Sequence, residues 1–187
     1  MVQRKPRRAA PPLNESTLGE LALAYVGRFA TTRAKLRFYL ARKVRERGWN
    51  GAAEPDLEAL AERFAIQGYV DDSAYALAKA QALAARGYGK RRLAQRLRGA
   101  GVADEDSVAA REHSDGQAVE AALRFAERRR IGPFALGATD PKAREKALAA
   151  MVRAGHGFGL ARAIVRMPPG APIDRDELTD LAATTLI

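Results

Sequence analysis

Basic side chains surround a single phenylalanine in the segment 33–47 and offer the first candidate binding chemistry. If this segment is a helix, Lys35, Phe38, Arg42 and Arg45 share one face, because residues three, four and seven positions apart meet on a helix surface. An exposed aromatic ring among cations is typical of a protein-docking surface or of a platform for base stacking. The more common alternative is that Phe38 packs against a neighbouring helix while only the arginine head groups meet solvent.

A second basic run, at positions 86–98, contains no acidic residue. On a helix Arg91 and Arg98 point the same way, and Arg92 and Arg96 form a second stripe. Such a density of one charge sign suits a polyanion or an acidic protein surface, although a merely solvated helix has the same appearance. The candidate partner-binding residues of the chain are therefore Lys35, Phe38, Arg42, Arg45, Lys90, Arg91, Arg92, Arg96 and Arg98.

Residue types that carry catalysis or bind metals are few. The chain has no cysteine and two histidines, His113 and His156, so disulfides, cysteine–zinc sites and thiol catalysis are excluded. Asp71 and Asp72 precede a helical segment, where N-capping explains them better than metal binding or a pair of catalytic carboxylates. Residues 87–89 resemble a fragment of a phosphate loop but lack the rest of a Walker motif, and we interpret them as a helix stop, a core aromatic and a helix start. We expect neither an enzyme nor a cofactor or metal site.

The elements that must position these side chains are predicted to be helices. Apolar residues recur at helical spacing, and no run alternates as a strand does. A capping box formed by Thr17 and Glu20 is expected to begin the first helix, and Thr32 and Asp174 are expected to cap later ones. Helices are predicted over 18–29, 32–48, 55–68, 71–87, around 93–97, after 104, over 117–130 and 140–152, around 160–164, and over 174–181.

The helices repeat along the chain. The pattern Leu36, Leu40, Val44 recurs as Leu93, Leu97, Gly101 and again as Ala147, Met151, Gly155. This indicates a small tandem array of three-helix units, each with a basic middle helix. The predicted organisation is a basic, disordered arm over 1–16, three-helix repeats over 17–70, 71–115 and 116–167, and an acidic tail over 168–187.

Composition agrees with a folded, basic protein. The 187 residues include 32 Lys plus Arg and 22 Asp plus Glu, which gives a net charge of +10, and 47% of the residues are hydrophobic. A further basic run consists of Arg124, Arg128, Arg129 and Arg130. No stretch approaches the about 20 apolar residues of a membrane span, and the basic N-terminus is not followed by the apolar core of a signal peptide. We therefore expect a cytoplasmic protein with no membrane partner.

Three ordered blocks of the sequence resemble the RecX family of recombination regulators, over about residues 18–167. The segment 49–55 looks like a loop insertion that occurs in one branch of that family. The blocks are Leu23-Ala24-Tyr25-Val26-Gly27-Arg28-Phe29 running on to Leu36, then Gln67-Gly68-Tyr69-Val70-Asp71-Asp72, then Arg86-Gly87-Tyr88-Gly89-Lys90-Arg91-Arg92-Leu93 with Gly99-Ala100-Gly101-Val102.

This resemblance implies both a shape and a function. The shape is an elongated, curved all-α array of tandem three-helix repeats. The function is that of a regulator that binds the RecA recombinase and its filament on single-stranded DNA and inhibits RecA ATPase, strand-exchange and co-protease activities. Weak, non-specific DNA binding is expected beside it. Independently of the resemblance, we expect a monomer, because three stacked units share a core. The basic stripes alone leave an alternative open, a helical protein whose main role is direct non-specific DNA binding.

Overall fold

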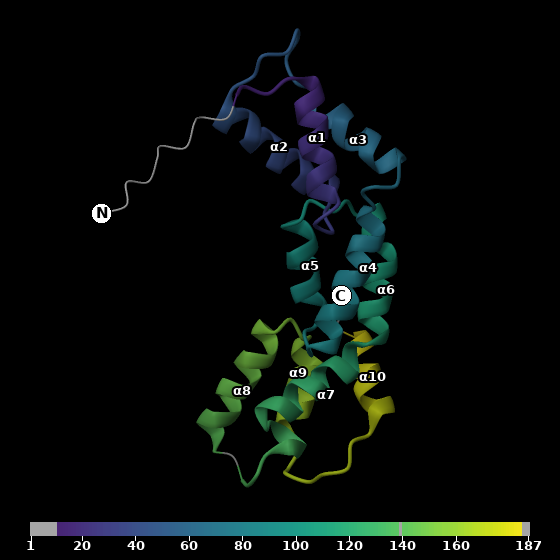
Figure 1. Cartoon of the computed structure of the whole chain (residues 1–187). Helices are drawn as coiled ribbons and strands as arrows, with labels where there is room; N and C mark the ends of the chain where they lie inside the picture. Colours follow the sequence, from purple (N-terminus) through teal and green to yellow (C-terminus); the bar gives the residue numbers. More distant parts are fainter. Residues whose placement is uncertain (1–10, 139, 185–187) are drawn as a thin grey trace, which may run out of the picture. The chain divides into compact units, whose positions relative to one another are not determined.

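Every regular element is a helix in the part of the chain that the structure, a computed structural model, describes: residues 11–138 and 140–184. The predicted all-α fold of three-helix repeats is confirmed (Figure 1). The helices are α1 (Glu15–Val26), α2 (Arg33–Arg47), α3 (Leu57–Ile66), α4 (Asp72–Ala85), α5 (Lys90–Arg98), α6 (Val108–Gly116), α7 (Ala118–Arg129), α8 (Pro141–Arg153), α9 (Phe158–Arg166) and α10 (Arg175–Ala183), with short 3-10 turns at Glu105–Ser107 and Gly132–Phe134.

The chain divides into two compact units, Met1–Asp72 and Ser73–Ile187. Unit 1 contains α1, α2 and α3, and its limit lies close to the predicted end of the first repeat. Unit 2 contains the helices of the second and third predicted repeats together with α10. Each unit is described separately below.

The first helix begins earlier than the sequence pattern predicts. Asn14 is its N-cap: the Asn14 side chain accepts a hydrogen bond from the Thr17 backbone at 3.0 Å, and Thr17 Oγ1 accepts one from the Asn14 backbone at 2.9 Å. The prediction of a capping box starting at Thr17 is therefore wrong, because Thr17 is already the third helical residue. Leu13 is fully buried, so residues 13–16 belong to unit 1 and not to an arm, whereas residues 1–10 lie outside the described part.

The core of unit 1 forms where the apolar stripe of α2 meets α1 and α3. Leu36 and Leu40 are fully buried in a cluster that includes Phe64 of α3. Thr32 caps α2 as predicted, since its hydroxyl accepts a hydrogen bond from the Lys35 backbone at 3.1 Å. The capping interpretation of Asp72 is incomplete. Asp72 starts α4, but its carboxylate also accepts a hydrogen bond from the Arg33 backbone N–H at 2.9 Å, in the first turn of α2.

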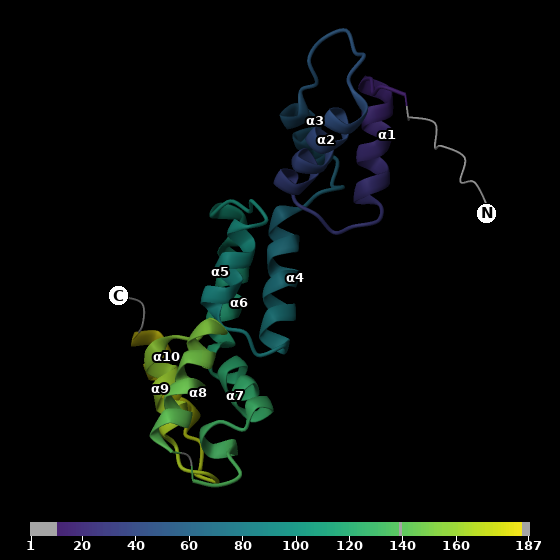
Figure 2. The same ribbon diagram turned by 90° about the vertical axis from the view of Figure 1, so that its left-hand side faces the viewer.

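Unit 2 has two clusters of buried residues. Leu93 and Leu97 of α5 pack with residues of α4 and α6. Met151 of α8 and Ile164 of α9 pack with residues of α7. Figure 2 shows the helices of these two groups. The segment predicted as an acidic tail contains α10, which packs against α7 and α9, with Leu178 fully buried. Asp174 caps α10 as predicted. The helix of this acidic segment therefore belongs to the cluster that contains Met151 and Ile164.

Two glycines join the second and third repeats within unit 2. The Gly89 backbone N–H donates to the Ala154 carbonyl at 3.0 Å, and the Arg91 backbone N–H donates to the Gly155 carbonyl at 3.2 Å. A Cβ on Gly89 would lie 2.4 Å from the Gly155 carbonyl oxygen, and Gly155 itself has a φ of +99°. Main-chain carbonyls at the end of α8 thus accept hydrogen bonds from N–H groups at the start of α5. The partial negative charge of these carbonyls is favourable there, because a helix N-terminus carries partial positive charge.

Candidate partner-binding surfaces

The first candidate surface, the α2 surface, consists of Lys35, Phe38, Arg42 and Arg45. The Phe38 side chain is exposed, at 72% of its full accessibility, on the helix whose opposite face buries Leu36. The interpretation that Phe38 packs against a neighbouring helix is therefore wrong. Its ring is available to a partner.

Charges on α2 are partly compensated within the helix. Glu46 pairs with Lys43 at 2.7 Å and with Arg42 at 3.8 Å, and Arg37 pairs with Glu58 of α3. The hydrogen bond from Lys43 is the main cause that holds the pKa of the Glu46 carboxyl below its usual value. Because α2 carries many more cations than the single acid Glu46, its exposed side stays positive.

An aromatic contact series that the sequence analysis did not find links α1 to α2. The ring of Phe29 lies 5.3 Å from that of Tyr25, which stacks on Tyr39 at 4.1 Å. Arg42 lies over the same Tyr39 ring at 5.8 Å. Phe29 is 56% exposed, although an apolar position at helical spacing normally indicates the core. Phe29 lies just beyond the last turn of α1, where the helical period no longer applies.

The five candidate cations of α5 do not act as one set. Arg92 donates to the Gln95 side chain at 3.0 Å and its guanidinium lies over the Tyr88 ring at 5.9 Å. Lys90 pairs with Asp115 of α6, as described below, and Arg96 is exposed. Arg91 and Arg98 share a face, as their spacing predicts, and both line the same cavity.

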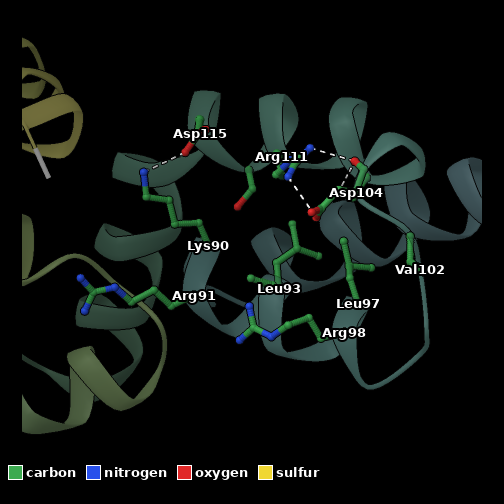
Figure 3. Close-up of a pocket in the computed structure, with 12 residues that line it drawn as sticks. Lys90, Arg91, Leu93, Leu97, Arg98, Val102, Asp104, Arg111 and Asp115 are labelled. Carbon is green, nitrogen blue, oxygen red and sulfur yellow. Dashed lines mark hydrogen bonds and ion pairs between the residues drawn. The ribbon is translucent and has the colours of Figure 1, made fainter. Parts of the chain in front are cut away.

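This cavity, the α5–α6 groove, has a volume of about 500 Å³ and an apolar floor (Figure 3). Leu93 and Leu97 lie almost fully buried beneath the floor, and the exposed apolar part of the floor is formed by Ala94 of α5 and Val102 of the following turn. The two arginines of α5 lie along one side of the groove, here called the arginine edge and defined as Arg91 and Arg98. No local sequence pattern predicts this groove, because its opposite wall comes from α6. The distance between α5 and α6 depends on tertiary packing.

The opposite side of the groove, the paired edge, consists of two ion pairs. Lys90 lies 3.1 Å from Asp115, and Arg111 lies 3.4 Å from Asp104 (Figure 3). The Arg111 guanidinium also donates to the Asp104 carbonyl at 2.8 Å. Both cations of this edge therefore already have anionic partners.

The third basic run has a structural role. Arg124 donates to the Ala84 carbonyl at 2.8 Å, and Arg128 donates to the carbonyl of Arg86. Both acceptors lie at the end of α4, where unpaired carbonyls and the helix dipole favour a cation. Arg124 and Arg128 thus hold α7 against the end of α4.

Comparisons with known proteins agree with this architecture. A family profile described as the second three-helix domain of RecX matches residues 71–110, which span α4, α5 and the start of α6. The regulatory protein RecX of Myxococcus xanthus is 35% identical over 179 residues, which are 89% of this chain and 91% of that protein. The chain belongs to the RecX family. The regulatory protein RecX of Agrobacterium fabrum is 31% identical over 140 residues, 73% of this chain and 74% of that protein.

Solved structures of RecX proteins share the fold. The crystal structure of RecX from Lactobacillus salivarius superimposes with a TM-score of 0.58 at 15% identity, over 81% of this chain and 94% of that one. A second crystal structure, of regulatory protein RecX, superimposes with a TM-score of 0.58 at 18% identity, over 81% of this chain and 70% of that one. The RecX profile falls on the repeat that holds the α5–α6 groove.

None of the helices within residues 11–138 and 140–184 has both the length and the hydropathy that a membrane span needs.

Proposed function

We propose that this RecX-family protein binds the RecA recombinase assembled on single-stranded DNA and inhibits its ATPase, strand-exchange and co-protease activities. The observation that supports this best is a pair of basic surfaces, each with apolar character. On α2 an exposed aromatic ring lies among cations, and on α5 two arginines border an apolar groove. Docking sites on proteins combine apolar anchors with charged rims in this way.

The test is inhibition of the single-stranded-DNA-dependent ATPase of RecA by the purified chain. Reversing the charge of Lys35, Arg42 and Arg45 together should weaken inhibition, because each reversal replaces attraction by repulsion. The same result is expected for reversal of Arg91 and Arg98 together. Circular dichroism should show unchanged helicity in both variants. Full inhibition by both variants at wild-type concentration would show that these are the wrong surfaces.

The competing function is direct, non-specific DNA binding, which the net charge of +10 favours. A pull-down separates the two functions. Capture of the chain by RecA on single-stranded DNA is expected to exceed capture by the same DNA without RecA, at equal salt. Equal capture by both would favour the DNA-binding alternative.

A further inference from the structure

The α5–α6 groove has a chemistry that limits what can occupy it. Its floor is aliphatic, with Ala94 and Val102 as the exposed part, and no aromatic side chain lines the groove. Base recognition on single strands depends largely on stacking against aromatic rings, so the groove lacks the main device for holding nucleobases. A phosphate group alone would leave the aliphatic floor without a partner. The floor therefore favours an occupant with an aliphatic side chain of its own.

The two edges of the groove differ in charge. On the paired edge, both cations have carboxylate partners within 3.4 Å. On the arginine edge, Arg91 and Arg98 are exposed, and neither forms an ion pair in the part of the chain that is described. An occupant thus meets uncompensated positive charge along one edge only. It must be amphipathic, with its acidic groups on one side of the apolar contact.

The spacing of the arginines sets the spacing of those acidic groups. Arg91 and Arg98 are seven positions apart on α5, which is about two turns or about 10.5 Å along the helix axis. Carboxylates seven positions apart on a second helix lie at the same distance. Side chains four and eight positions after the first carboxylate both lie on one side of the two carboxylates, and aliphatic side chains there would face Ala94 and Val102.

We propose that the α5–α6 groove is a docking site for an acidic amphipathic helix of a protein partner. Its aliphatic side chains pack on Ala94 and Val102, and two carboxylates seven residues apart pair with Arg91 and Arg98. This inference rests on the proposed function in one respect, since the same two arginines belong to the candidate surface for RecA. It goes further by naming the chemical class of segment that this surface recognises.

A designed peptide tests the inference directly. The probe is a fluorescein-labelled helical peptide of about 15 residues, built on alanine and glutamine, with glutamate at its fourth and eleventh positions and leucine at its eighth and twelfth. Fluorescence anisotropy should show saturable binding to the full chain. The variant Arg91→Glu with Arg98→Glu should weaken binding by about tenfold or more. Replacing both glutamates of the peptide by glutamine should weaken it similarly.

A matched control uses the same repeat. The variant Lys79→Glu with Arg86→Glu makes the same charge change at positions that are also seven apart but do not line the groove. It should bind the peptide with an affinity close to that of the wild type. An uncharged block, Ala94→Phe, fills the groove without altering charge and should also weaken binding.

Three results would overturn the inference. They are equal affinity of the Arg91→Glu, Arg98→Glu variant and the wild type, equal affinity of the glutamate and glutamine peptides, and oligo(dT) binding that depends on the arginine edge while the peptide does not bind. The last result would make the groove a nucleic-acid site. RecA ATPase inhibition, measured in parallel, separates the two proposals. Inhibition without peptide binding contradicts only the groove proposal, and peptide binding without inhibition contradicts only the proposed function.

Discussion

Phe38 presents an aromatic ring to solvent at little cost to the fold, so its removal separates binding from stability. Because Phe38 is 72% exposed, Phe38→Ala should change the free energy of unfolding by no more than about 0.5 kcal/mol. Inhibition of RecA should nevertheless weaken if the ring is an anchor. Urea unfolding and the ATPase assay measure the two effects.

The matched control is Phe64→Ala in the core of unit 1, where Phe64 is only 6% exposed. This truncation should cost about 3–5 kcal/mol. If Phe38→Ala were as costly as Phe64→Ala, the exposed position of Phe38 would be contradicted.

His156 makes unit 2 sensitive to acid. It is 2% exposed, its Nε2 lies 3.2 Å from the Gly87 carbonyl, and burial lowers its pKa from 6.5 to about 4. Between these pH values the unfolded chain binds a proton that the folded chain does not, so stability falls as the pH falls from 6.5 to about 4. The loss should be about 3 kcal/mol at most.

Unfolding measured at pH 7 and at pH 4.5 tests this, with His156→Gln as the variant that removes this part of the pH dependence. A wild-type slope that persists in His156→Gln would assign the effect to other groups.

Neighbouring threonines at the start of α2 should respond oppositely to valine. Thr31 is 5% exposed and its hydroxyl oxygen has no hydrogen-bond partner among the described residues, so Thr31→Val should leave stability unchanged or raise it by about 1 kcal/mol. Thr32→Val removes the N-cap of α2 and should cost about 0.5–2 kcal/mol. Thermal unfolding of the two variants compares them. A destabilised Thr31→Val would show that this hydroxyl has a partner after all.

Among the elements, α5 is held at its N-terminus by backbone hydrogen bonds from Gly89 and Arg91 to the end of α8. Gly89→Ala would place a Cβ 2.4 Å from a backbone oxygen, which cannot move as a flexible side chain can. We expect a loss of several kcal/mol, or separation of the two repeats of unit 2. Gly99→Ala at the opposite end meets its nearest atom at 3.4 Å and should be tolerated.

Calorimetry and proteolysis of the two glycine variants test this difference. Equal stability of Gly89→Ala and Gly99→Ala would contradict the close contact with Gly155. A single unfolding transition of unit 2 in the wild type that becomes two transitions in Gly89→Ala would support this contact.

Local signals predicted most of the elements but not their meeting points. The caps at Thr32 and Asp174 lie where the sequence places them, because capping depends on residues within one turn. The start of α1 was misjudged, since Asn14 and Thr17 both offer capping groups and only the packing of Leu13 decides between them.

Tertiary features escaped the sequence analysis for a related reason. The α5–α6 groove and the contact of Gly89 with Gly155 depend on distances between segments far apart in the chain. The common face of Arg91 and Arg98 was predictable, since it follows from helical spacing alone. The ion pair of Lys90 with Asp115 was not predictable, because Asp115 lies on another helix.

At the scale of the whole molecule, the net charge of +10 governs behaviour toward bare nucleic acid. Binding to oligo(dT) should be weak, independent of sequence and strongly dependent on salt. For about five phosphate contacts, log K should fall with log salt concentration at a slope of about −3.5. Anisotropy titrations at several salt concentrations measure this slope. Tight, sequence-selective binding that persists at about 200 mM salt would favour the DNA-binding alternative.

The joint made by Gly89 and Gly155 has an evolutionary consequence. Main-chain atoms form the hydrogen bonds of this joint, so side-chain changes at neighbouring positions leave these hydrogen bonds chemically intact. A Cβ added at Gly89 or at Gly155 would instead collide with backbone atoms. A saturation library selected for folding should therefore show two narrow positions where glycine alone survives. Proline at Arg91 should be depleted as well, because proline lacks the N–H that donates to the Gly155 carbonyl.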